Sequence, residues 1–215
     1  MDLVIFDLDG TLVDSRTDLV NAANATREHF GYSPLPADVV ASYVGNGAPV
    51  LIRRVLGGDQ AVEHEVEHGI PFFLEYYGRH LLDHTVLYPG VIETLVKLRD
   101  LRIPAAVLTN KPEVPTNQIL NGLKIDPYFF RIYGGDSFPH KKPNPIGIDA
   151  LMREVKATRE RTMMVGDSHV DIKTARNAGV VACGVTFGLQ PETLVTDPPD
   201  ILIDAMPKLL LSMLA

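Results

Sequence analysis

Hydrophobic and polar positions follow two different patterns in different parts of the chain. From about residue 85 onward, short apolar runs alternate with longer amphipathic stretches. Such alternation predicts β and α units in turn, and therefore a parallel sheet with helices on both faces. The amino-terminal run from Leu3 to Phe6 is apolar throughout and contains β-branched and aromatic residues. It is typical of a strand that is buried on both faces.

The stretch between these two parts contains helical patterns and no strand pattern. We expect helices from Ser15 to Phe30, over 36–44, over 48–56, and as a pair over 59–82 that Gly69 and Pro71 interrupt. Ser15 and Asp18 have the spacing of a capping box. The pattern therefore predicts an α/β fold, a Rossmann-like parallel sheet core with an all-helical insertion after the first strand, which the resemblance described below identifies as a cap domain. We assign residues 1–14 and 85–215 to the core and residues 15–84 to the cap.

The core pattern resolves into five further strands and five helices. The predicted strands cover 104–108, 129–133, 161–165, 180–185 and 201–203, and the predicted helices cover 91–102, 114–123, 146–155, 170–178 and 207–214.

Composition narrows the class of protein. A chain of 215 residues that is 46% hydrophobic can bury a full core and carry an insert. A net charge of −7 argues against a nucleic-acid surface. No apolar stretch reaches the length of a membrane helix and the start lacks the pattern of a signal peptide, so we expect a cytoplasmic protein. Cys183 is the single cysteine and lies in an apolar run, which excludes an intramolecular disulfide and favours a buried structural thiol.

Polar residues follow several predicted strands where each strand ends. They are Asp7, Asp9, Thr109, Asn110, Lys142, Asp167 and Asp171. Taken singly, each could be a solvated turn, a surface loop or a helix cap. Because the carboxyl ends of parallel strands share one edge, their order along the chain favours a common site. Carboxylates crowded there would repel one another unless a cation lay among them, and oxygen ligands favour Mg²⁺.

The run Asp7-Leu8-Asp9-Gly10-Thr11 resembles the first signature of the haloacid dehalogenase superfamily of phosphotransferases. Thr109-Asn110, Lys142 and Gly166-Asp167 follow in the order of that superfamily. The resemblance implies a phosphatase in which the carboxylate of Asp7 attacks phosphorus and forms an aspartyl-phosphate, while Asp9 acts as general acid and then as general base.

The same resemblance implies roles for the remaining candidates. Asp7, Asp9 and Asp167 would hold Mg²⁺, Asp9 through its backbone carbonyl. Thr109, the Asn110 amide and Lys142 would bind the phosphoryl oxygens, and Lys142 would also balance developing charge. A further set of residues would orient these groups without binding the metal or the substrate directly: Asp171, Ser168 and Thr11. His140 and His169 lie beside the motifs and receive no role.

A closer resemblance extends over nearly the whole chain. The segments Val44-Gly45-Asn46-Gly47-Ala48, Arg53-Arg54-Val55-Leu56-Gly57, Leu87-Tyr88-Pro89-Gly90-Val91 and Gly184-Val185-Thr186-Phe187-Gly188 are similar to bacterial phosphoglycolate phosphatases, although Phe187 stands where tyrosine is expected. This implies hydrolysis of 2-phosphoglycolate to glycolate and phosphate. Gly45, Asn46 and Arg53 are the candidate substrate contacts, since an arginine suits a carboxylate, but Arg53 and Arg54 could equally solvate the helix surface.

Other activities are possible on the same core, and the residues present argue for or against each of them. A phosphonate hydrolase needs a lysine in the cap, and no lysine precedes Lys97. A haloacid dehalogenase does not need Asp9 or the other metal-binding acids. A phosphohexose mutase remains an alternative, because Arg53 and Arg54 could hold a distal phosphate. Phosphatases for a sugar phosphate, a nucleotide or pyrophosphate also remain alternatives. A non-catalytic phosphate-binding protein would be expected to lack Asp7 or Lys142. The expected partner is a small phosphate ester, and both a monomer and a homodimer are compatible with the sequence.

Overall fold

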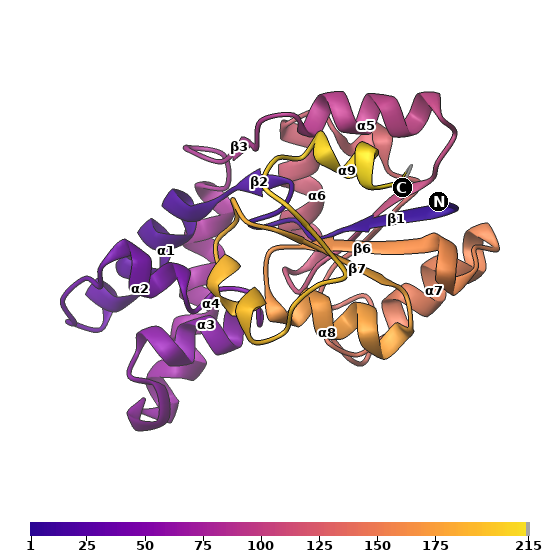
Figure 1. Cartoon of the computed structure of the whole chain (residues 1–215). Coiled ribbons are helices and arrows are strands. Elements are labelled where there is room, and N and C mark those ends of the chain that lie inside the picture. The colour runs from indigo at the N-terminus through magenta and orange to yellow at the C-terminus, as the bar shows by residue number, and fades with distance from the viewer. Residues whose placement is uncertain (214–215) are drawn as a thin grey trace.

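A six-stranded parallel sheet forms the centre of the computed structural model, which describes residues 1–213 (Figure 1). The strands lie in the order β5-β4-β1-β6-β7-β8. Their bounds are Leu3–Phe6 for β1, Ala105–Leu108 for β4, Arg131–Tyr133 for β5, Thr162–Gly166 for β6, Val181–Val185 for β7 and Ile201–Ile203 for β8. The predicted α/β fold is confirmed, and each of the predicted core strands is present.

Strand β1 is buried on both faces, as its continuous apolar run predicts. Leu3 and Ile5 pack into one hydrophobic cluster, and Val4 and Phe6 pack into another on the opposite face. Successive side chains of a strand point to opposite faces, so a strand between two layers of helices must be apolar at every position. This burial fixes the place where β1 ends and its polar residues begin.

Helices cover both faces of the sheet (Figure 1). Helices α5 (Val91–Asp100), α6 (Glu113–Gly122) and α9 (Lys208–Ser212) share the cluster of Val4 and Phe6. Helices α7 (Ile146–Val155) and α8 (His169–Ala178) share the cluster of Leu3 and Ile5. Helix α9 lies inside the predicted range 207–214, of which Leu214 is outside the described residues. None of the described helices has the length and apolar character needed to cross a membrane.

Four helices follow β1 and pack on one another beside the sheet. They are α1 (Arg16–His29), α2 (Ala37–Ala41), α3 (Ala48–Val55) and α4 (Glu63–Arg79), and together they form the helical segment, residues 16–79. A short antiparallel ribbon of β2 (Val13–Asp14) and β3 (Val86–Leu87) flanks the segment. The chain therefore enters and leaves the segment at neighbouring points. A ribbon of two-residue strands is too short to show a period of two in the sequence.

The predicted interruption at Gly69 and Pro71 is wrong, because α4 is continuous through both residues. Gly69 lies against α3, and a Cβ at this position would stand 3.1 Å from side-chain atoms of both Ile52 and Leu56. Gly69 thus permits close packing of two helices. Tertiary contact outweighs the local cost of glycine and proline in this helix.

The predicted capping box at the start of α1 is also wrong. The Ser15 hydroxyl donates to Asp9 Oδ1 at 2.6 Å. The Asp18 carboxylate instead accepts hydrogen bonds from the backbone N–H groups of His84 and Thr85, from the Thr85 hydroxyl and from the His84 ring. Both side chains therefore bind distant parts of the chain, and Asp18 joins the first helix to the returning strand segment.

Candidate active site

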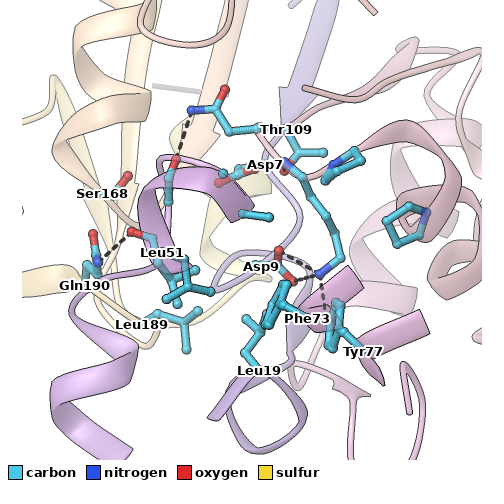
Figure 2. A pocket seen from close by; sticks show the side chains of 18 of the residues that line it. Asp7, Asp9, Leu19, Leu51, Phe73, Tyr77, Thr109, Ser168, Leu189 and Gln190 are labelled. Atoms are coloured by element: carbon cyan, nitrogen blue, oxygen red, sulfur yellow. Dashed lines mark hydrogen bonds and ion pairs between the residues drawn. The ribbon is translucent and has the colours of Figure 1, made fainter. Parts of the chain in front are cut away.

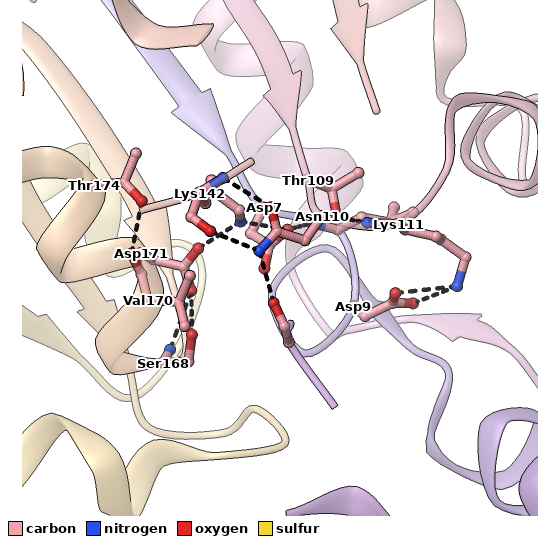
Figure 3. A network of polar contacts seen from close by, with 12 residues as sticks. Asp7, Asp9, Thr109, Asn110, Lys111, Lys142, Ser168, Val170, Asp171 and Thr174 are labelled. Atoms are coloured by element: carbon pink, nitrogen blue, oxygen red, sulfur yellow. Dashed lines mark hydrogen bonds and ion pairs between the residues drawn. The ribbon is translucent and has the colours of Figure 1, made fainter. Parts of the chain in front are cut away.

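Polar side chains from three strand ends and one loop meet at the carboxyl edge of the sheet (Figure 3). Asp7 follows β1, Thr109 and Asn110 follow β4, and Asp167 follows β6. Asp7, Asp167 and Asp171 each bring one carboxylate oxygen within 4.8 Å of the others, and all three residues are buried. The edge of the sheet therefore concentrates negative charge, as the positions of these residues along the chain predict.

The ammonium group of Lys142 lies between two of these carboxylates. Its Nζ is 2.9 Å from Asp7 Oδ1 and 2.6 Å from Asp171 Oδ1, and the lysine side chain is only 2% exposed. One ammonium against three carboxylates leaves a net negative site when all four groups are ionised. A buried site of this charge is stable only when a further cation or protons complete it.

The pKa values of the buried acids reflect both their burial and this concentration of negative charge. Burial raises the pKa of Asp7 to about 6, with Lys142 opposing the shift and Asp171 adding to it. Burial, then Asp171 and Asp7, raise the pKa of Asp167 well above its usual range. Burial alone would lower the pKa of Lys142, but Asp171 and Asp7 outweigh it and raise that pKa, so the lysine stays charged.

Glycine at position 10 allows the loop after Asp9 to pass Asp167 at close range. Gly10 has φ of +84°, and a Cβ built on it would stand 2.2 Å from Asp167 Oδ2. On the other side of that carboxylate, the backbone N–H groups of Leu189 and Gln190 donate to Asp167 Oδ2 at 2.7 and 3.1 Å. The orientation of Asp167 is therefore set by backbone on two sides.

The donor set fits a hard divalent cation. All three acidic side chains offer oxygen, which Mg²⁺ and Ca²⁺ prefer. One oxygen of Asp171 accepts a hydrogen bond from Lys142, and the other accepts from the backbone N–H and the hydroxyl of Ser168. Within residues 1–213, Asp7 Oδ2 and Asp167 Oδ1 accept no hydrogen bond and remain available to a metal.

The Asp9 side chain lies outside the acidic cluster and is held by other groups (Figure 2). Lys111 Nζ lies 3.0 Å from each Asp9 carboxylate oxygen and 2.6 Å from the Tyr77 hydroxyl oxygen. Burial would lower the pKa of Lys111, but Asp9 and Tyr77 together outweigh it and raise that pKa. Burial raises the pKa of Tyr77 to about 12. These contacts place Asp9 between the core and helix α4.

Sequence reasoning missed Lys111 and Tyr77 as site residues. Lys111 directly follows Thr109 and Asn110, so its position at a strand end was a usable signal. Tyr77 lies within an amphipathic helix, and nothing local separates it from the other aromatic residues of α4. Gln190 was missed as well. Its side-chain amide donates to the backbone carbonyls of Ala41, Ser42 and Val44 in and after α2.

The Asn110 side chain makes contacts that differ from the expected one. Its Nδ2 donates to the carbonyls of Gly45 at 2.9 Å and Lys142 at 3.1 Å, and its Oδ1 accepts from the Lys142 backbone N–H at 2.9 Å. The amide therefore positions the Lys142 loop and contacts the helical segment. Thr109 lines the pocket as expected.

Two further predicted site residues, Thr11 and Asn46, do not line the pocket. Thr11 is fully buried, and its hydroxyl has no hydrogen-bond partner within residues 1–213. Asn46 is absent from the residues that line the pocket, whereas its neighbours Gly45 and Gly47 line it.

The structure does not bring Arg53 to the site. Its side chain is 43% exposed, and its Nη2 lies 2.7 and 2.8 Å from the two Glu63 carboxylate oxygens. Arg54 donates to the Tyr43 carbonyl instead. The surface interpretation left open by the sequence therefore describes Arg53, whereas Arg54 is half-buried against the segment that follows α2.

A pocket lies between the acidic edge and the helical segment (Figure 2). Asp7, Asp9, Asp167 and Ser168 lie at its core end. The walls on the opposite side are largely apolar and include Leu19, Val44, Ala48, Leu51, Phe73 and Leu74. The pocket therefore leads to Asp7 along an apolar wall that the helical segment provides.

Comparison with known sequences decides the family. The sequence profile described as haloacid dehalogenase-like hydrolase matches residues 4–185, which is most of the chain. The chain belongs to this family. The match begins inside β1 and ends with β7, so it contains each of the strand ends that form the site.

Relatives of this haloacid dehalogenase-like hydrolase include named phosphatases. Phosphoglycolate phosphatase of Neisseria gonorrhoeae is 42% identical over 96% of this chain and 90% of its own. That of Vibrio parahaemolyticus is 39% identical over 97% of this chain and 94% of its own. The crystal structure of a predicted phosphoglycolate phosphatase from Haemophilus somnus superimposes with a TM-score of 0.93 at 32% identity, covering 99% of this chain and 97% of that one. The fold and the helical segment are therefore those of this group.

Proposed function

We propose that this protein is a Mg²⁺-dependent phosphatase that hydrolyses 2-phosphoglycolate to glycolate and phosphate through an aspartyl-phosphate on Asp7. The observation that carries the proposal is the buried cluster of Asp7, Asp167 and Asp171 with Lys142 bonded to two of its members. The substrate follows from the names of relatives that match nearly the full chain at about two-fifths identity.

In the first half-reaction, Asp7 attacks the phosphorus atom and the ester oxygen departs with a proton from Asp9. The Lys142 ammonium offsets negative charge on Asp7 and on the phosphoryl oxygens as they approach. Thr109 contributes its hydroxyl and Asn110 its backbone N–H to the same oxygens. The Asn110 side chain acts indirectly, since it holds the Lys142 backbone.

In the second half-reaction, Asp9 takes a proton from the water that attacks the phosphoryl group on Asp7. One carboxyl group can act as acid and then as base because the first step leaves it ionised. The bond between the Asp7 oxygen and phosphorus then breaks, which releases phosphate and regenerates the Asp7 carboxylate.

Asp7, Asp167 and the backbone carbonyl of Asp9 would hold the Mg²⁺ ion. When bound, the ion neutralises charge on the phosphoryl oxygens and on the surrounding carboxylates. Asp171 keeps Lys142 in place and is itself fixed by Ser168 at the start of α8. Thr11 packs behind the first loop as a buried support.

We propose that the helical segment acts as a cap on the core, with the division at residues 1–14 and 85–215 against 15–84. Support comes from the apolar wall that it contributes to the pocket and from the β2–β3 ribbon at its base. A closed cap would exclude bulk water before transfer. A cytoplasmic location and a monomeric or homodimeric state complete the proposal.

The test is the release of inorganic phosphate by the purified protein with Mg²⁺ and with EDTA. The panel consists of 2-phosphoglycolate, sugar phosphates, nucleoside monophosphates and pyrophosphate. We expect metal-dependent release that is highest with 2-phosphoglycolate. A preference for another ester would keep the mechanism and overturn the substrate, while no release from any member of the panel would overturn the proposed hydrolase.

A further inference from the structure

The pocket contains one cationic side chain away from Asp7. Among the described residues that line the pocket, Lys111 alone carries a positive side chain, and the surface facing it from the helical segment is apolar apart from the Tyr77 hydroxyl. An anionic group on a substrate, other than the phosphoryl group itself, therefore finds its favourable contact at Lys111. Arg53 does not compete for this role, because its side chain is exposed on the helical segment and does not line the pocket.

Tyr77 supplies a second donor at the same point. Its hydroxyl oxygen accepts from Lys111, and the hydrogen bonds of residues 1–213 leave the hydroxyl proton without an acceptor. The Tyr77 ring stacks on Phe73 with centroids 5.5 Å apart, which fixes the direction of the hydroxyl group. An ammonium and a hydroxyl that lie 2.6 Å apart can together bind the two oxygens of one carboxylate when the ammonium turns one of its N–H groups from Asp9 to the ligand.

The position of Lys111 also matches the shape of the proposed substrate. Asp9 must lie within hydrogen-bond reach of the ester oxygen in order to protonate it. Lys111 Nζ lies 3.0 Å from both Asp9 oxygens, so it is next to the place that the leaving group occupies. In 2-phosphoglycolate a single methylene group joins the ester oxygen to the carboxylate carbon. The carboxylate of a substrate seated on Asp7 and Asp9 is thereby directed to Lys111.

We propose that Lys111 of the core and Tyr77 of helix α4 form the carboxylate-recognition site of this enzyme. The inference rests on the proposed hydrolysis of 2-phosphoglycolate and adds the residues that select it. A carboxylate held by both groups bridges the core and the helical segment. Esters that lack the carboxylate gain nothing from the pair and leave Lys111 on Asp9.

The experiment compares kcat/KM for 2-phosphoglycolate and for 2-hydroxyethyl phosphate, in which an alcohol replaces the carboxylate. Lys111→Met is expected to lower the preference for 2-phosphoglycolate, the ratio of the two kcat/KM values, by about 10- to 100-fold, the size of a lost charge-assisted contact, on top of any loss through Asp9 that both substrates share. Tyr77→Phe is expected to reduce the same preference by a smaller factor. Lys111→Arg, which keeps the charge, is expected to retain part of it.

Two control variants remove similar groups outside the pocket. Arg53→Met deletes a cation on the surface of the helical segment, and Tyr76→Phe deletes a hydroxyl one position before Tyr77. Neither Arg53 nor Tyr76 lines the pocket, so both variants are expected to keep the wild-type preference. Thermal unfolding of each variant shows whether the fold is retained, and Tyr77→Phe decides the matter if Lys111→Met does not fold.

An equal loss with both substrates in Lys111→Met would overturn the inference, because Lys111 would then act only through Asp9. Binding provides a readout that does not depend on turnover. In an Asp7→Asn background, isothermal titration with Mg²⁺ present is expected to show tighter binding of 2-phosphoglycolate than of 2-hydroxyethyl phosphate, and Lys111→Met should abolish the difference. If the wild type released no phosphate from 2-phosphoglycolate, the proposed function would fail, and equal affinities in the Asp7→Asn protein would separately refute carboxylate recognition.

Discussion

Asp18 is a buried carboxylate that serves the fold. Its oxygens accept four hydrogen bonds from His84 and Thr85, which lie far along the chain, just after the helical segment. Burial on its own would raise the pKa of Asp18, but the bonds from Thr85 and His84 outweigh it and lower that pKa. The ionised form therefore stabilises the native state.

Asp18→Asn is expected to lower the free energy of unfolding at pH 7 by about 2 kcal/mol, because an amide cannot accept from all of these donors. A lowered pKa in the folded state means that the contribution is present above the pKa of the unfolded chain and is lost as the pH falls through the folded value. The difference between wild type and variant, measured by urea unfolding, should therefore shrink below about pH 4. A difference that is constant from pH 7 to pH 3 would contradict this account.

Single residues at strand ends could be predicted from the sequence, and residues paired across elements could not. Asp7, Asp167 and Thr109 each follow a run of apolar residues that marks the end of a strand, so local pattern is enough to place them. The contact of Lys111 with Tyr77 depends on how α4 packs beside the core. Arg53 was a candidate by charge alone, and the exposed face of α3 removes it from the site.

Helices and strands could be predicted from the sequence where a single hydrophobic pattern extends over the whole element. Strand β1 is apolar throughout because both faces are covered, and the helices of the core follow amphipathic stretches. Helix α4 shows the opposite case. Gly69 and Pro71 locally favour a break, but packing of Gly69 against Ile52 and Leu56 keeps the helix continuous. The β2–β3 ribbon depends on pairing between distant residues and has no local signal.

Strand β7 contains the single cysteine, and its burial makes a testable difference. Cys183 lies between β6 and β8 in the sheet, is fully buried, and has its pKa raised to about 12 by burial. Since the thiolate is the reactive form, the native protein should not react with iodoacetamide at pH 8. In guanidinium chloride, where the strand is exposed, one equivalent should react. Stoichiometric alkylation of the native protein, followed by mass spectrometry, would contradict the burial of this strand.

At the scale of the whole molecule, the core and the helical segment meet at the site through a few polar contacts. Asn110 of the core donates to the Gly45 carbonyl, Gln190 donates to carbonyls in and after α2, and Lys111 contacts Tyr77. Each contact lies next to a residue of the proposed chemistry. The overall division into a sheet and a helical insert could be predicted from the change of rhythm near residue 85, but these contacts could not, because they join residues far apart in the chain.

The central claim is that Asp7 is the nucleophile of a Mg²⁺-dependent phosphatase. The most direct measurement compares phosphate release from 2-phosphoglycolate by the wild type and by Asp7→Asn, each with Mg²⁺ and with EDTA, after circular dichroism has shown that both proteins are folded. Asn is nearly isosteric but cannot form the acyl phosphate, so we expect release by the wild type with Mg²⁺ only and none by the variant. Steady-state turnover by folded Asp7→Asn, or release by the wild type that persists in EDTA, would contradict the account.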